Sequence, residues 1–82
     1  MDDLLFRRLI TIVNRHATSG LPVKATDIMY VHGTQEDFED MIRQIEEEIN
    51  FIISFPPNVD IGELTVNQFI GHILRQREEM SK

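Results

Sequence analysis

The sequence predicts an all-α fold, a small bundle of three long helices with one or two short helical turns. Apolar residues recur at helical spacing in three stretches, which begin near residues 2, 34 and 65. Only the run 51–55 has a strand-like composition, and no second strand is visible to pair with it. At 82 residues the chain has room for one domain, 1–82, with a small core.

The first helix is predicted over residues 2–17. Its buried face contains Leu5, Leu9, Ile12 and Val13. Asp2 and Asp3 lie at its start, where negative charge interacts favourably with the helix dipole. We expect the helix to end before Gly20 and Pro22, because glycine tolerates the left-handed conformation and proline cannot continue the hydrogen-bond ladder.

The connection over 18–33 is too apolar to be a solvated tether. Its apolar residues are Leu21, Val23, Ile28, Met29 and Val31. We therefore expect it to lie across the bundle, with a short turn of helix around residues 25–29.

The second long helix belongs to the segment 33–50. Thr34 is the expected N-cap and Asp37 stands three residues later, which is the spacing of a capping box. The apolar stripe of this helix contains Phe38, Ile42, Ile45 and Ile49, with Met41 beside it. After this helix, we expect 51–55 to be a buried extended segment, since Pro56 and Pro57 force extended backbone.

The last helix is expected to open at Thr65, with Gln68 at the capping-box position. Its buried face contains Val66, Phe69, Ile70, Ile73 and Leu74. Arg75 and Arg77 lie towards its end, where positive charge is favoured. One helical turn is expected before it, within residues 59–64.

The 33–50 segment carries the whole net charge of the chain. Its carboxylates are Glu36, Asp37, Glu39, Asp40, Glu46, Glu47 and Glu48. Only Arg43 opposes them, and acids and bases cancel elsewhere, so the net charge of −6 belongs to this segment. Such a charge repels phosphate backbones and anionic lipid, so we expect neither nucleic acid nor a membrane surface as a partner. A protein with a basic surface is the natural counterpart.

The sequence has no cysteine, which suits a reducing cytoplasm and leaves no disulfide or thiolate metal site. The N-terminus lacks the basic start and apolar core of a signal peptide, and no apolar run reaches the length of a membrane span. We therefore expect a cytoplasmic protein.

Two runs of residues together resemble the acyl carrier protein family, and the likeness spans almost the whole chain. In that family the second long helix commonly ends with three glutamates between apolar residues, as Ile45 to Ile49 do here. The final helix of the family commonly opens with Thr-Val and continues with apolar residues three, four and seven positions after the valine. The residues that match this pattern are Thr65, Val66, Phe69, Ile70 and Ile73. The resemblance implies an acyl-carrier-like helical bundle.

The chain departs from this family where the prosthetic group is attached. The family carries phosphopantetheine on a serine at the start of the second long helix, and here that position falls on Gln35 or Glu36, depending on the alignment. Neither side chain can form the phosphodiester. Thr34 has a hydroxyl one residue early, and an N-cap explains it better than an attachment site. We therefore expect no cofactor, with phosphopantetheine only if Thr34 is an atypical attachment site.

The acidic helix is the expected docking surface, because proteins of the resembled family present this helix to their enzymes and clustered carboxylates steer association. The candidate partner-binding residues are Glu36, Asp37, Glu39, Asp40, Glu47 and Glu48. The alternative is a solvated face that keeps a small protein soluble.

No catalytic residue and no metal site is predicted. The carboxylates have no partner nucleophile, glycine-rich phosphate loop or zinc-protease spacing to organise a reaction, so we expect no enzyme. His16, His32 and His72 are too far apart in sequence for a recognised zinc signature. Six apolar residues of the two later helices either line an acyl-chain cavity, as in the resembled family, or form a filled core, which we favour. They are Phe38, Met41, Ile45, Phe69, Ile70 and Ile73.

The favoured function is a non-enzymatic, acyl-carrier-like binding module that docks through its acidic helix onto a basic partner protein. One alternative is a true acyl carrier with an atypical phosphopantetheine site, acting in fatty-acid or polyketide-type metabolism. Another is a small structural or oligomerisation domain that pairs through an exposed 51–55 stretch, so the chain is expected to be a monomer or a weak homo-oligomer.

Overall fold

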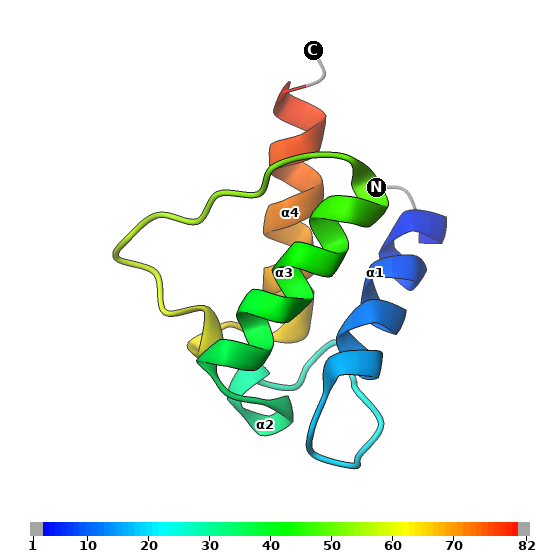
Figure 1. Ribbon diagram of the computed structural model, residues 1–82, viewed down its shortest axis with the longest axis vertical. Helices are drawn as coiled ribbons and strands as arrows, with labels where there is room; N and C mark the ends of the chain where they lie inside the picture. The colour runs from blue at the N-terminus through cyan, green and yellow to red at the C-terminus, as the bar shows by residue number, and fades with distance from the viewer. Residues whose placement is uncertain (1–2, 81–82) are drawn as a thin grey trace.

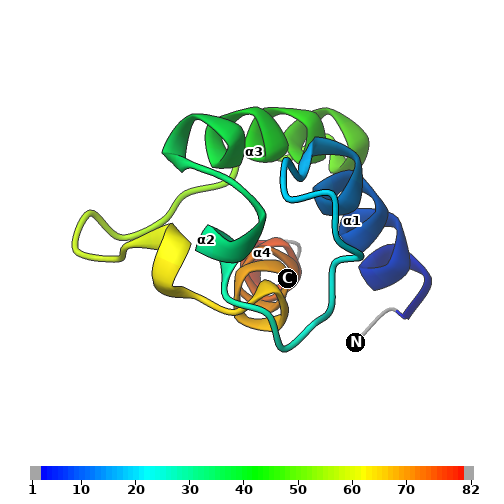
Figure 2. The same ribbon diagram turned by 90° about the horizontal axis from the view of Figure 1, so that it is seen from below.

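The computed structural model describes residues 3–80 and contains only helices and connections within them, which confirms the all-α prediction. The elements are α1 (Asp3–His16), α2 (Met29–His32), α3 (Gln35–Ile49), a 3-10 turn η1 (Ile61–Glu63) and α4 (Val66–Met80). The long helix α1 packs against α3 and α4, whereas α2 and η1 are single turns at one end of the bundle (Figure 1). Seen from that end, α2 lies between α3 and α4 (Figure 2). None of the described helices combines the length and the hydropathy that crossing a membrane requires.

The predicted apolar faces form one core. Each long helix contributes four fully or nearly buried side chains: Leu5, Leu9, Ile12 and Val13 from α1, Phe38, Met41, Ile45 and Ile49 from α3, and Val66, Phe69, Ile70 and Ile73 from α4. Ile42 and Leu74 were also predicted to be buried, and they pack at the edge of this core, partly exposed. Three amphipathic helices thus bury their apolar stripes against one another, which is the main source of stability in such a bundle.

Both predicted capping boxes are present. Thr34 is the N-cap of α3, and its backbone N–H donates to Asp37 Oδ2 at 2.8 Å. At the start of α4, Thr65 N–H donates to Gln68 Oε1 at 3.0 Å and Gln68 N–H donates to Thr65 Oγ1 at 3.1 Å. These bonds satisfy backbone donors that have no partner inside a helix, so the starts of both helices are fixed by local chemistry. Helix α3 ends at Ile49, and its C-cap residue Asn50 takes the left-handed conformation with φ 53°.

The short helix between α1 and α3 lies at Met29–His32, so the expectation of a turn around residues 25–29 was wrong in position. The carbonyls of Ala25 and Asp27 instead accept hydrogen bonds from Asn67 N–H (2.9 Å) and Val66 N–H (2.8 Å). These are first-turn amides of α4, which need acceptors from outside their own helix. Pairing with the start of α4 therefore keeps the residues before Met29 out of a helix.

The segment 51–55 lies beside α4 without regular secondary structure. Ile53 is buried, the two phenylalanines are half-buried, and Ile52 is 79% exposed. The backbone of Ser54 is held by Gln76, which accepts from its N–H at 2.9 Å and donates to its carbonyl at 3.0 Å. The expected burial is therefore confirmed only in part. The stretch considered for self-association presents a single large exposed apolar side chain.

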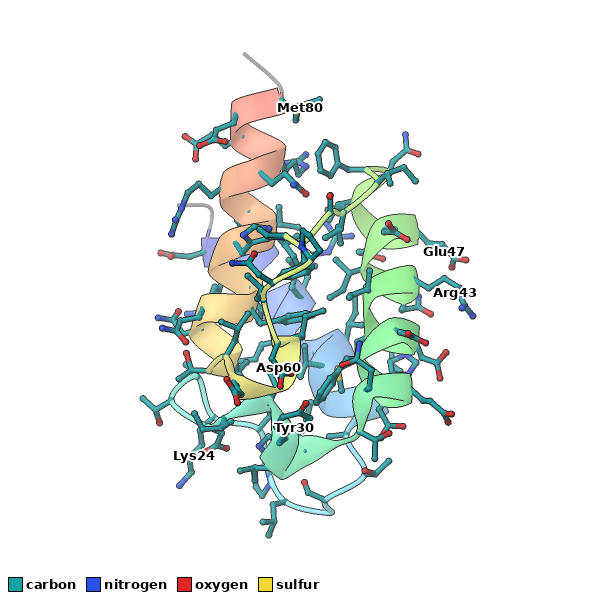
Figure 3. All side chains as sticks on the ribbon, turned by 90° about the vertical axis from the view of Figure 1, so that its left-hand side faces the viewer. Lys24, Tyr30, Arg43, Glu47, Asp60 and Met80 are labelled. Carbon is teal, nitrogen blue, oxygen red and sulfur yellow. The ribbon has the colours of Figure 1, made fainter. Side chains whose placement is uncertain are left out.

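Tyr30 joins α2 to η1. Its hydroxyl donates to Asp60 Oδ1 at 2.7 Å, and its ring lies 5.7 Å from that of Phe38, measured between centroids. Figure 3 shows Tyr30 and Asp60 pointing towards each other at the lower end of the molecule. A Cβ placed on Gly62 would lie 2.1 Å from the Tyr30 ring, so only glycine allows this approach.

Tyr30 is expected to titrate at a pH above 10.0, the ordinary pKa of tyrosine, because the hydrogen bond to Asp60 and its negative charge raise the pKa of the phenol. The chain has one tyrosine and no tryptophan, so tyrosinate absorbance reports this residue alone. Folding favours the neutral phenol, so this contribution to stability is present at lower pH and is lost as pH rises through the folded-state pKa. The same titration in guanidinium chloride is the control, and an equal midpoint in both states would contradict the prediction.

Candidate functional site

The surface of α3 opposite the core is acidic. Glu36, Asp40, Arg43 and Glu47 follow one another at intervals of three or four residues and are all exposed. That spacing places them on one face of a helix. Figure 3 shows Arg43 and Glu47 pointing away from the bundle. The core therefore faces one side of α3 and charge faces the other.

Four exposed carboxylates, Glu36, Glu39, Asp40 and Glu47, form what we call the carboxylate stripe. Asp40 Oδ1 lies 3.7 Å from Arg43 Nη1, with both side chains more than half exposed, so this contact contributes little to stability. The other three carboxylates have no ion pair or hydrogen bond within residues 3–80. Most of the negative charge of the stripe is therefore neither paired with a basic side chain nor engaged in a hydrogen bond that stabilises the fold.

The remaining acids of α3 have partners within the molecule. Asp37 accepts from the backbone of Thr34 in the capping box, and Glu48 pairs with Arg8 of α1. Glu46 Oε2 accepts from Ile53 N–H at 2.9 Å and so holds the chain that leaves α3. Of the six predicted partner-binding residues, four therefore lie in the stripe and two, Asp37 and Glu48, have structural contacts.

The start of α3 is where the resembled family carries its prosthetic group. Gln35 and Glu36, the two positions that the alternative alignments match to the serine of that family, are exposed there. The Thr34 hydroxyl donates to Asp37 Oδ2 at 3.1 Å, so it belongs to the capping box. A group attached at Thr34 would have to displace this hydrogen bond.

The six residues considered for an acyl-chain cavity are all fully buried members of the core cluster. They come from α3 and α4, the two helices predicted to contribute them. Their side chains pack with those of α1 rather than lying along an open groove.

A second polar cluster lies at the end of the bundle that contains α2. His32 is only 1% exposed, and both of its ring nitrogens have partners. Nε2 lies 2.7 Å from Asp27 Oδ2, and Nδ1 lies 2.8 Å from Ser19 Oγ. The backbone carbonyl of His32 accepts from Thr18 N–H at 2.8 Å, so the connection after α1 is bound to α2 at several points.

The charges of this cluster follow from its hydrogen bonds. Folding lowers the pKa of Asp27, chiefly because its carboxylate accepts from His32 and also because it accepts from the backbone N–H of Lys24. An ionised carboxylate can only accept, so His32 Nε2 carries the proton of that bond. In the neutral imidazole, Nδ1 is then free to accept from the Ser19 hydroxyl.

The sequence did not predict this cluster, and His32 was considered only as one of three histidines that are too far apart for a zinc signature. No short motif signals it, because Ser19 lies 13 residues before His32. His16 and His72 are elsewhere: His16 ends α1, and Nε2 of His72 lies 2.9 Å from the carbonyl of Ser54. Within residues 3–80, no three side chains of the metal-binding types are close enough to hold an ion.

Two features therefore stand apart from the apolar core, the carboxylate stripe on α3 and the Ser19–His32–Asp27 cluster between α1 and α2. They lie on different elements and share no residue. Comparison with protein-family models, with curated proteins and with solved structures finds no match for this chain.

Proposed function

We propose that this chain is a non-enzymatic, acyl-carrier-like binding module of the cytoplasm. It docks through the carboxylate stripe of α3 onto the basic surface of a partner protein. The observation that carries the proposal is the uncompensated negative charge of Glu36, Glu39 and Glu47 on one outward face. The resemblance of the sequence to acyl carrier proteins, which present the corresponding helix to their enzymes, supports the same face.

The position of the charge supports docking over a merely solvated surface. The acids concentrate on one helix, whereas a generic soluble surface intersperses both signs. Helix α3 is also held at both ends, by the capping box at Thr34 and by the contacts of Glu46 with the following segment. A rigid, single-signed stripe steers a basic partner and fixes its register.

Charge reversal within the stripe is expected to weaken partner binding. A photo-crosslinking residue at position 47 first identifies the bound protein, with position 79 on α4 as the control site. Binding of that purified protein is then measured for Glu39→Lys/Glu47→Lys and for Glu63→Lys/Glu79→Lys, which change the net charge equally. The first variant should bind at least about tenfold more weakly, since one close charge pair contributes on the order of 1.5 kcal/mol or more.

Two controls make this test decisive. Helicity of each variant is checked by circular dichroism, because all four positions are exposed and should not affect folding. Affinity of the wild type should fall as salt increases. Unchanged binding of the Glu39/Glu47 variant refutes the proposal, and equal losses in both variants would show that only net charge matters.

The binding module and the carrier alternative predict different protein masses after co-expression with a broad-specificity phosphopantetheinyl transferase. A carrier would gain the mass of phosphopantetheine. We expect an unmodified intact mass, because the family's serine is replaced and the Thr34 hydroxyl is held by Asp37. Intact-protein mass spectrometry measures this directly. An added phosphopantetheine mass that disappears in Thr34→Ala would favour an atypical carrier over a binding module.

A further inference from the structure

Ser19, His32 and Asp27 have the arrangement of an activated nucleophile. A hydroxyl lies 2.8 Å from one nitrogen of a buried imidazole, and a carboxylate lies 2.7 Å from the other. A nucleophile within hydrogen-bond reach of a base, with the base oriented by a third group, is the signature of covalent catalysis. The ring is turned relative to serine proteases, in which Nε2 faces the serine. Either ring nitrogen can accept a proton, so the reversed orientation of the imidazole does not prevent this chemistry.

The environment of Ser19 leaves space for a reactant. Ser19 is partly exposed, and beside the position where a Cβ of the adjoining Gly20 (φ 74°) would stand, no atom lies within 4 Å other than those of Gly20 and its two chain neighbours. The backbone N–H groups of Ser19 and Gly20 have no acceptor within residues 3–80. Chymotrypsin-type proteases use the amide of the nucleophile as one oxyanion donor, and α/β-hydrolases use the amide of the residue after it, each together with a second amide from elsewhere.

We propose that Ser19 accepts an acyl group from an activated ester, as a stoichiometric acylation site. Ser19 Oγ forms a bond to the carbonyl carbon while its proton moves to His32 Nδ1. The bond from that carbon to the leaving oxygen then breaks, and the departing oxygen takes the proton from His32. The products are acyl-Ser19 and a free alcohol or phenol, so no further reactant is needed.

His32 acts in this step as the general base, and Asp27 is a positioning residue. The Asp27 carboxylate fixes the proton on Nε2, which directs the free electron pair of Nδ1 towards Ser19. It also stabilises the imidazolium that forms when His32 takes the proton. A purely structural cluster would have the same hydrogen bonds, so only the reaction rate of Ser19 separates the two interpretations.

Acetylation by p-nitrophenyl acetate tests the proposal, with Ser54 as a control inside the same molecule. Ser54 is more exposed than Ser19, and its hydroxyl has no histidine partner. Peptide mass spectrometry follows the acetyl group on each serine over time. Ser19 should react at least about 100-fold faster than Ser54, which is the acceleration typical of a positioned general base. In guanidinium chloride the two serines should react at the same rate.

Two variants refine the test. Ser19→Ala should eliminate the rapid adduct. Asp27→Asn should slow acetylation of Ser19 at least about tenfold while the circular dichroism spectrum stays unchanged, because the amide no longer stabilises the imidazolium. Equal rates at Ser19 and Ser54 in the folded wild type would overturn the proposal, whatever the variants do.

Discussion

Truncation of Phe69 to alanine is expected to lower the free energy of unfolding by about 3–5 kcal/mol. Phe69 is fully buried near the start of α4, and its ring stacks on that of Phe55 with centroids 5.7 Å apart. Removing the ring loses its transfer free energy and leaves a cavity that the three long helices cannot close without shifting. The total free energy of unfolding of a native domain is about 5–15 kcal/mol, so the loss is a large share of its stability.

Urea denaturation followed by circular dichroism measures this loss, and thermal melting should show a midpoint lower by ~12 °C or more. Ile52→Ala is the matched control, because Ile52 is 79% exposed and its truncation should change stability by no more than about 0.5 kcal/mol. A loss at Phe69 as small as that at Ile52 would contradict the packing of α4 described above.

Replacement of His32 by alanine is expected to cost about 2–4 kcal/mol, the second-largest effect. The imidazole is 1% exposed and bonds to both Asp27 and Ser19. Its removal leaves a cavity and takes one hydrogen bond from each of these two groups, which keep only their contacts with nearby backbone N–H groups. The carbonyl of residue 32 still accepts from Thr18, because that bond involves only the backbone. The decrease in the free energy of unfolding therefore reports what the His32 side chain contributes, and not the backbone bond to Thr18.

His16→Ala is the control for this variant, measured by the same urea denaturation. His16 is partly buried, and its Nε2 has no hydrogen-bond partner within residues 3–80, so about 1 kcal/mol or less should be lost. The difference in the free energy of unfolding between the wild type and His32→Ala should also become smaller at acidic pH. Folding lowers the Asp27 pKa below 3.8, so its contribution is present above pH 3.8 and is lost as pH falls through the folded-state pKa. Equal losses in the two histidine variants would refute the structural role of the cluster.

The long helices and their caps could be predicted because their causes are local. The stripe that contains Phe38 and Ile45 repeats at helical spacing, and each N-cap lies three residues before its partner, as with Thr65 and Gln68. Such patterns need only a few neighbouring residues to specify the conformation. The starts of the second and last long helices and the ends of the first two therefore agree with the structure to within one residue, whereas Asp2, where the first helix was expected to begin, lies outside the described residues.

The errors occur where distant segments meet. The short helix was placed too early because Ala25 and Asp27 pair with the start of α4, about 40 residues further along the chain. The Ser19–His32–Asp27 cluster also depends on how the connection after α1 folds back onto α2. No spacing in the sequence encodes such contacts.

For the candidate site, the amino-acid sequence alone determined that α3 is acidic and that its net charge is uncompensated. The tertiary structure decided which acids remain available, because only packing brings Arg8 of α1 to Glu48 and the chain after α3 to Glu46. Local periodicity places a side chain on a helix face. Its partners come from other elements, whose positions follow from burial of the common core.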